Sequence, residues 1–218
     1  MALRVVVEAT PKRVFASALD WPGWSRGAKT EDEALQALVD YRDRYAAVPR
    51  RAGIRFDPPA TVRGVSVVER QDGGASTEFG IPSLPAAGED EPIDARELHR
   101  LVGLLRAAWA EFDAVAEKAH GVSLRLGPRG GGRQVPKIME HVREAEGAYV
   151  AQLGSKVAGS ASMDELRDAF IDALSARAAG DEPPNPNKVR KRWPPRYAVR
   201  RSAWHALDHA WEIEDRSS

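Results

Sequence analysis

The sequence has 218 residues, of which 43% are hydrophobic, and its 32 basic and 32 acidic residues leave a formal net charge of +0. This balance favours neither nucleic acid nor membrane as a default partner. The absence of cysteine excludes disulfides and thiolate metal ligands, so thiol chemistry would need a thiol cosubstrate. No run approaches the roughly 20 apolar residues of a membrane span, and residues 1–8 are charged too early for a signal peptide. We therefore expect a cytoplasmic protein.

Residues 1–70 predict a small β-β-α-β domain. Residues 3–8 are rich in β-branched side chains, and residues 13–19 alternate between two faces, which predicts two antiparallel strands. A further strand is predicted at residues 62–70, where valines recur. Residues 71–93 are rich in glycine, proline and acidic side chains and show no periodicity, which predicts a linker and a domain boundary.

The helix of this first domain is predicted from its start signal. Thr30 and Glu33 have the spacing of a capping box, and the helix that follows should end before Pro49. Residues 14–24, which end in an Asp-Trp-Pro-Gly-Trp turn, and residues 30–35 together resemble the N-terminal part of HicB-like antitoxin domains. No recognisable DNA-binding module follows, so antitoxin activity is not expected. We expect an accessory lid or a dimerisation surface instead.

Residues 94–218 predict an up-down four-helix bundle, which makes the expected fold class α+β. Apolar residues recur at three- and four-residue spacing in four segments. These predicted helices cover residues 94–119, 135–153, 162–180 and 196–215. Bundles of antiparallel helices build metal sites from side chains on facing helices.

Three histidines in these helices predict such a site. His205 and His209 lie four residues apart, so a helix places both imidazoles on one face. His141 lies on the apolar face of the second predicted helix. Three neutral nitrogens can hold a divalent metal and leave a coordination position open; zinc fits best, and nickel or iron also accept imidazole. Two alternatives stay open: the histidines could be hydrogen-bonded core residues, or the metal could only brace the bundle.

Carboxylates beside the histidines are candidates for supporting and catalytic roles. Glu144 or Glu146 could orient His141, and Asp208 or Glu212 could orient the pair or act on a metal-activated water. The candidate catalytic residues are therefore Glu144, Asp208 and Glu212. The nearby tryptophans of the last helix are expected to pack rather than to contact a substrate.

Residues 141–146 and 204–209, taken in this helix order, resemble the DinB-like superfamily, which includes mycothiol-dependent maleylpyruvate isomerases and bacillithiol transferases. The resemblance implies a four-helix bundle in which His141, His205 and His209 hold a divalent metal. It also implies the activity of a low-molecular-weight-thiol S-transferase. Metal-dependent hydrolysis is the other reaction for which an open coordination position would be used.

A thiol or electrophile with anionic groups would need cationic partners in this site. Arg129, Arg133 and Arg201 are the expected substrate-binding residues. Arg129 and Arg133 belong to a glycine-rich connector that lacks the Gly-Lys-Ser/Thr ending of a P-loop, so we interpret it as a helix-helix connection.

A non-enzymatic regulatory or binding protein, with a structural metal or none, is the alternative function, and a homodimer is left open. Basic residues surround Trp193 and Tyr197 and could contact nucleic acid. Pro194 and Pro195 interrupt any continuous basic helix, so nucleic acid is not the expected partner. The basic residues are Lys188, Arg190, Lys191, Arg192, Arg196, Arg200 and Arg201.

Overall fold

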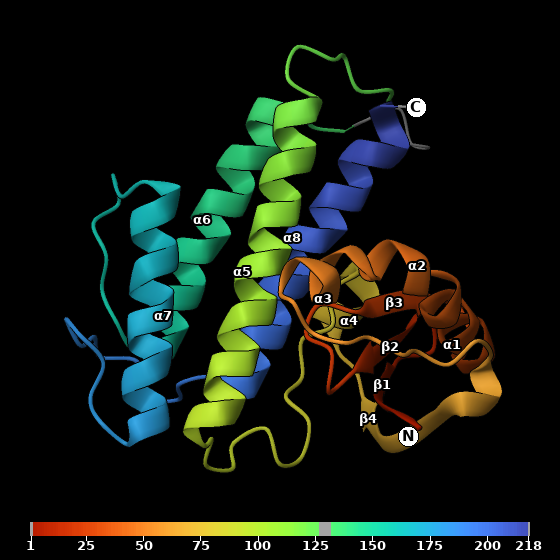
Figure 1. Cartoon of the computed structure of the whole chain (residues 1–218), viewed down its shortest axis with the longest axis horizontal. Coiled ribbons are helices and arrows are strands. Elements are labelled where there is room, and N and C mark those ends of the chain that lie inside the picture. Colours follow the sequence, from red (N-terminus) through yellow and green to blue (C-terminus); the bar gives the residue numbers. More distant parts are fainter. Residues whose placement is uncertain (1, 127–131, 218) are drawn as a thin grey trace.

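A four-stranded sheet forms the N-terminal part of the chain, and helices follow it (Figure 1). The computed structural model describes residues 2–126 and 132–217. The strands are β1 (Leu3–Ala9), β2 (Val14–Ala18), β3 (Ser25–Ala28) and β4 (Val65–Asp72), in the spatial order β3-β2-β1-β4. The architecture thus combines a mixed sheet with helices, which confirms the coarse part of the α+β prediction.

The central pairing of the sheet is the one that alternation in the sequence predicts. β1 and β2 are antiparallel, with Val7 opposite Ala16, and both strands are almost completely buried. β4 pairs with β1 in parallel. β3 is not predicted from the sequence, because its residues Ser25–Ala28 carry no apolar alternation and are held instead by ladder hydrogen bonds to β2.

The first helix begins where its capping box predicts. The Thr30 hydroxyl accepts a hydrogen bond from the Glu33 amide, and the Glu33 carboxylate accepts one from the Thr30 amide. The predicted single helix up to Pro49 is wrong, because the chain bends after α1. The structure has α1 (Glu31–Asp40), α2 (Arg42–Tyr45) and α3 (Ala47–Arg51).

Aromatic contacts explain this bend. Tyr41, at the break, has φ −83° and ψ 0° and packs its ring edge-on against Trp211 of the last helix, with ring centroids 5.1 Å apart. The buried Tyr45 donates its hydroxyl to the Pro22 carbonyl at 2.9 Å. These two contacts hold the chain after the break against the last helix and against the turn that contains Pro22.

The segment 71–93 holds the end of β4 and a short helix, α4 (Ala75–Phe79). It is fastened to the sheet through the buried carboxylate of Glu8, which accepts hydrogen bonds from the amides of Ser83 and Leu84 at 2.8 and 3.1 Å. The predicted linker is thus packed against the first strand.

Four long helices follow, in the order that the periodicity predicts. They are α5 (Ala95–Lys118), α6 (Val135–Leu153), α7 (Met163–Ala179) and α8 (Pro195–Ser217). α8 packs against both α5 and α6, and α7 packs on α6 (Figure 1). None of the described helices combines the length and the apolar character that crossing a membrane requires.

The sheet and the long helices share one apolar core, in which α8 lies between the sheet and the other long helices. Val5 and Trp24 belong to the same buried cluster as Phe112 and Leu207. The closest approach is at Gly23, which has φ +92°; a Cβ atom there would lie 2.8 Å from Leu207 Cδ1. Only glycine allows this turn to pack directly on α8.

Candidate metal centre

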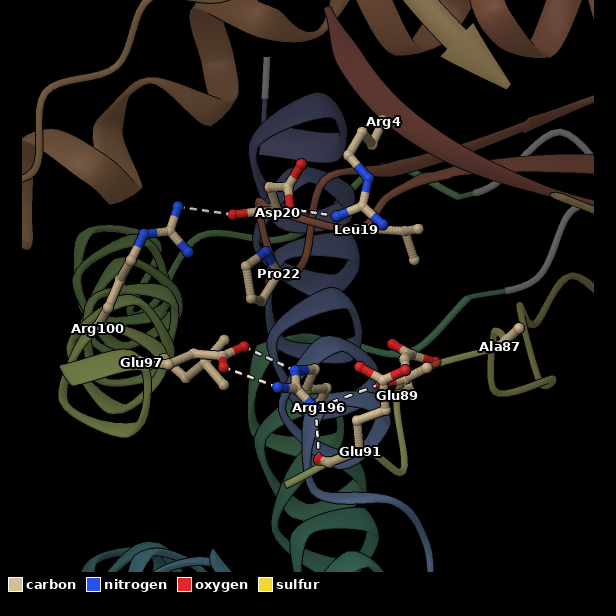
Figure 2. Close-up of a pocket in the computed structure, with 12 residues that line it drawn as sticks. Arg4, Leu19, Asp20, Pro22, Ala87, Glu89, Glu91, Glu97, Arg100 and Arg196 are labelled. Carbon is tan, nitrogen blue, oxygen red and sulfur yellow. Dashed lines mark hydrogen bonds and ion pairs between the residues drawn. The ribbon is translucent and has the colours of Figure 1, made fainter. Parts of the chain in front are cut away.

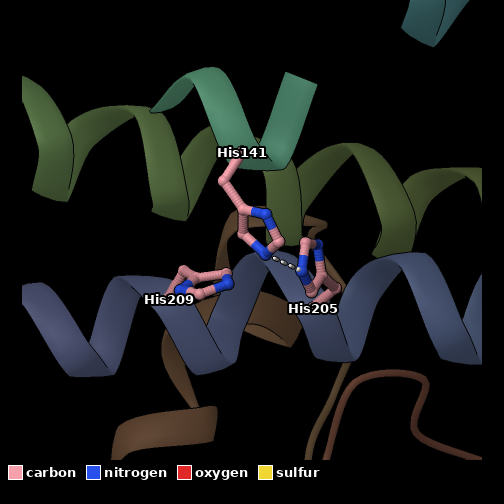
Figure 3. Close-up of side chains that lie close together, drawn as sticks. All are labelled: His141, His205 and His209. Carbon is pink, nitrogen blue, oxygen red and sulfur yellow. Dashed lines mark hydrogen bonds between the residues drawn. The ribbon is translucent and has the colours of Figure 1, made fainter. Parts of the chain in front are cut away.

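Three imidazoles converge between α6 and α8 (Figure 3). His141 projects from α6, and His205 and His209 project from consecutive turns of α8. One ring nitrogen from each histidine lies within 4.8 Å of the corresponding nitrogen of the other two. The two Nε2 atoms of His141 and His205 are 3.3 Å apart. The convergence that the sequence predicts is therefore present.

The spacing of two of the three nitrogens fits one tetrahedral ion. Two nitrogens bound to zinc at about 2.0–2.1 Å in tetrahedral geometry are separated by about 3.3 Å. The Nε2 atoms of His141 and His205 have this separation. The same distance also suits a hydrogen bond between the two rings. The position and orientation of the third histidine therefore distinguish a metal site from a simple hydrogen bond.

His209 is oriented by a carboxylate on its own helix. Its Nδ1 lies 2.8 Å from Glu212 Oε2, while Glu212 Oε1 accepts from Arg216 Nη1 at 2.6 Å. The hydrogen bond to His209 is the main reason why the pKa of Glu212 lies below its ordinary value. With the Nδ1 proton held by a carboxylate, Nε2 of His209 keeps its lone pair for a metal ion. Glu212 thus occupies the orienting position that the sequence predicts.

The surroundings keep the other two imidazoles neutral. Burial is the main cause that lowers the pKa of His205 well below its ordinary value, and the charges of His209 and Arg201 add to it. The pKa of His141 is lowered too, again mainly by burial and then by His209 and Arg133. Metal ions bind neutral imidazole, so this electrostatic environment suits ligands rather than cations.

The two other predicted catalytic carboxylates are coupled to the imidazoles by charge but, among the described residues, do not bond to them: the charge of Glu144 acts on the pKa of His141, and the charge of His209 acts on that of Asp208. Asp208 faces the sheet and pairs with Arg26 of β3 at 3.5 Å. Glu144 is exposed on α6. Neither makes a hydrogen bond to a histidine ring within the described parts of the chain, so no contact supports a catalytic role for them.

Glu146 has a different environment from the one predicted. Its fully buried carboxylate accepts hydrogen bonds from the Ser202 hydroxyl at 2.8 and 3.0 Å and from Trp109 Nε1 at 3.2 Å. Burial raises its pKa to about 7. Glu146 therefore ties α6 to α5 and α8 and does not orient His141.

Two of the three predicted substrate-binding arginines lie near the imidazoles. Arg133 is exposed, and its charge is among the causes that lower the pKa of His141 and His205. Arg201 is buried on α8, with its guanidinium carbon 4.6 Å from the Trp204 ring centroid and 5.3 Å from that of Tyr149. Arg129 lies outside the described residues.

The sequence analysis missed an aromatic wall beside His205. The Tyr149 ring lies edge-on to His205, with centroids 5.8 Å apart, and also contacts Trp193 at 5.2 Å. The sequence places Tyr149 and His141 on one apolar face of the second predicted helix, but this spacing does not predict that the Tyr149 ring meets His205. Trp193 precedes α8 in an irregular segment, where no periodic signal exists.

Arg196 and Arg200, which are among the basic residues around Trp193, form ion pairs within the chain. Arg196 forms a double hydrogen bond with Glu97 at 2.6 and 2.7 Å, at the edge of a polar cleft of about 450 Å³ (Figure 2). Arg200 forms a buried double hydrogen bond with Glu89 at 2.8 Å. Their charges serve to dock α8 on α5 and on the segment before it.

The site is thus assigned from the geometry of this chain: three imidazoles, a carboxylate that orients one of them, an aromatic wall and two nearby arginines. Comparison of the chain with protein-family models, with curated proteins and with solved structures finds no match in any of the three.

Proposed function

We propose that His141, His205 and His209 hold a divalent metal ion, zinc in the first instance, and that the chain is a DinB-like metal-dependent enzyme. The observation that carries this proposal is the approach of three imidazole nitrogens to within 4.8 Å of one another. Its support is the hydrogen bond from His209 to Glu212 and the lowered pKa of His141 and His205. A structural hydrogen-bond cluster would not need three imidazole rings that converge in this way.

A small-molecule thiol S-transferase is the reaction that we favour, with a metal-dependent hydrolase as the alternative. A divalent ion bound here would act as a Lewis acid that lowers the pKa of a thiol or water at its open position. The chain has no cysteine, so the nucleophile must come from solution. Arg201 and Arg133 would attract an anionic reactant, and Glu212 would hold the proton on His209 Nδ1 throughout.

The arrangement of α5 to α8 supports the DinB-like part of the proposal. Metal-ligand candidates come from the second and the fourth of these helices, which pack against each other. This is the layout that the resemblance implies. The HicB-like sheet packs on the opposite side of α8 from α6, where Arg26 meets Asp208, and we assign it an accessory role.

Elemental analysis of untagged protein tests the metal centre. We expect about one divalent ion per chain and a loss of at least tenfold in metal content for His205→Ala. His120→Ala, a histidine at the end of α5, is the control and should keep the ion. A chain that stays metal-free after zinc loading and dialysis contradicts the proposal.

Turnover of a thiol with a model electrophile tests the reaction. We expect zinc-loaded protein to accelerate the reaction of mercaptoacetate with monobromobimane above the uncatalysed rate. This acceleration should be lost in His205→Ala. If the protein binds metal but accelerates the reaction of no thiol or ester, the metal has only a structural role. That result would contradict the enzymatic part of the proposal.

A further inference from the structure

One turn of α8 carries three buried nitrogens for which the described part of the chain offers no hydrogen-bond acceptor. They are Arg201 Nη1, Trp204 Nε1 and His205 Nδ1. The three residues are only 8%, 4% and 6% exposed. Buried polar atoms in folded proteins almost always have a partner, so three on one turn require an explanation.

All three nitrogens are hydrogen-bond donors when the metal centre is formed. Guanidinium and indole nitrogens can only donate. His205 directs its Nε2 toward His141, so a metal-bound His205 carries its proton on Nδ1 and donates from there. The turn therefore offers three donors and no acceptor.

The side chains that carry these donors lie close together and beside the metal centre. The Arg201 guanidinium carbon is 4.6 Å from the Trp204 ring centroid, and the rings of Trp204 and His205 are 6.2 Å apart. Tyr149 covers the guanidinium at 5.3 Å and touches His205 with its ring edge. A group bound to Arg201 would thus lie within one helix turn of a metal ligand.

Arg201 feels the charges of Glu146 and Asp208 but forms no ion pair with either of them within the described parts of the chain. The nearby carboxylate of Glu146 accepts its hydrogen bonds from Ser202 and Trp109, and no ion pair joins it to Arg201 among the described residues. The adjacent Arg200 is equally buried but has a double hydrogen bond to Glu89. Of these two adjacent buried arginines, only Arg201 therefore has a buried guanidinium nitrogen without a partner among the described residues.

We propose that Arg201 and Trp204 form an anion subsite that binds the carboxylate of a small substrate or thiol next to the metal. The proposal rests on the metal centre proposed above and names the class of molecule that this centre takes. A guanidinium and an indole N–H match the acceptor atoms of a carboxylate, and burial strengthens such charged hydrogen bonds. Trp204, which the sequence suggests only packs, gains a binding role.

Cobalt(II)-loaded protein provides the test, because a thiol that ligates cobalt produces a sulfur-to-metal absorption band in the near ultraviolet. The probes are mercaptoacetate and its methyl ester, which differ in the carboxylate charge. We expect the wild type to bind mercaptoacetate about 10- to 100-fold more tightly than the ester. Arg201→Met should reduce this preference to about twofold or less and leave ester binding intact.

Two further variants separate binding from folding. Arg201→Lys keeps the charge and should keep most of the preference, while Trp204→Phe keeps the ring and should lose part of it. Circular dichroism and metal content must match the wild type in each variant. Equal binding of acid and ester, or a preference that survives Arg201→Met, overturns the subsite.

The failure of the metal-thiol proposal is a distinct result. If neither thiol produces the band, thiol ligation fails, and calorimetric titration of the metal-loaded protein with acetate then decides the subsite. Acetate binding that disappears in Arg201→Met supports the subsite, and no acetate binding in the wild type overturns it.

Discussion

Glu212, one turn along the same helix, accepts a hydrogen bond from His209, with 2.8 Å between His209 Nδ1 and Glu212 Oε2. This leaves the Nε2 atom of His209 free to face His141 and His205 (Figure 3). Carboxylates that orient a ligand histidine typically contribute 10- to 100-fold to metal affinity. We expect Glu212→Ala to weaken zinc binding by about this factor. Competition with a chromophoric chelator measures the change.

The control for this prediction is Glu144→Ala, which removes an exposed carboxylate from α6 near His141. Its zinc affinity should stay within about twofold of the wild type, because the carboxylate has no hydrogen bond to a ring. Equal losses in both variants would mean that net charge, and not the Glu212–His209 hydrogen bond, sets the affinity.

Metal binding should also stabilise the fold. The ligands join α6 to α8 across 64 residues of sequence, and this arrangement exists only in the folded state. At a free zinc concentration 100 times the dissociation constant, the free energy of unfolding should rise by about 2.7 kcal/mol. Urea unfolding with zinc and with chelator measures this difference, which should vanish in His141→Ala.

Because the carboxylate of Glu146 is buried, we expect the free energy of unfolding to depend on pH in a specific way. Its pKa is raised from 4.5 in the unfolded chain to about 7 in the fold, mainly by burial. The unfolded chain therefore releases this proton first, and the carboxylate lowers stability progressively as pH rises from 4.5 toward 7. Glu146→Gln removes this titration, so its stability relative to the wild type should increase by about 2 kcal/mol between pH 5 and pH 8.

Urea unfolding of the metal-free proteins at both pH values measures the effect. Glu144→Gln, an exposed carboxylate on the same helix, should show a pH dependence close to that of the wild type. A Glu146→Gln variant whose stability relative to the wild type is the same at pH 5 and pH 8 would show that Glu146 does not titrate in this range.

Local signals in the sequence predict much of this structure. The Thr30–Glu33 capping box starts α1 where expected, and 3.6-residue periodicity predicts the four long helices. The pair His205 and His209 follows from helix geometry alone. His141 needed one more step, the assumption that the second and fourth helices face each other.

Features that depend on tertiary contacts could not be predicted in this way. The bend at Tyr41 exists because its ring packs on Trp211, 170 residues further along the chain. The role of Glu146 depends on Trp109 and Ser202 from two other helices. No local pattern distinguishes Glu146 from the exposed Glu144, although the two are only two residues apart.

Gly23 couples the sheet to the helix that carries two of the three histidines. It has φ +92°, and a Cβ atom there would lie 2.8 Å from Leu207 Cδ1 and 3.0 Å from the Ala203 carbonyl carbon, on either side of His205 in sequence. Gly53, with φ +67° and no atom within 4 Å of such a Cβ, provides a matched control. Gly53→Ala should cost about 1–2 kcal/mol, from left-handed backbone strain alone.

Gly23→Ala should cost about 1–3 kcal/mol more than this control, because the added methyl group also overlaps α8. If α8 shifts to relieve the overlap, His205 and His209 move relative to His141, so zinc affinity should fall as well. Urea unfolding and chelator competition on both variants measure these effects. Equal destabilisation in the two variants would show that the turn does not press on α8, and unchanged zinc affinity in Gly23→Ala would show that the metal centre is insensitive to the packing of the sheet.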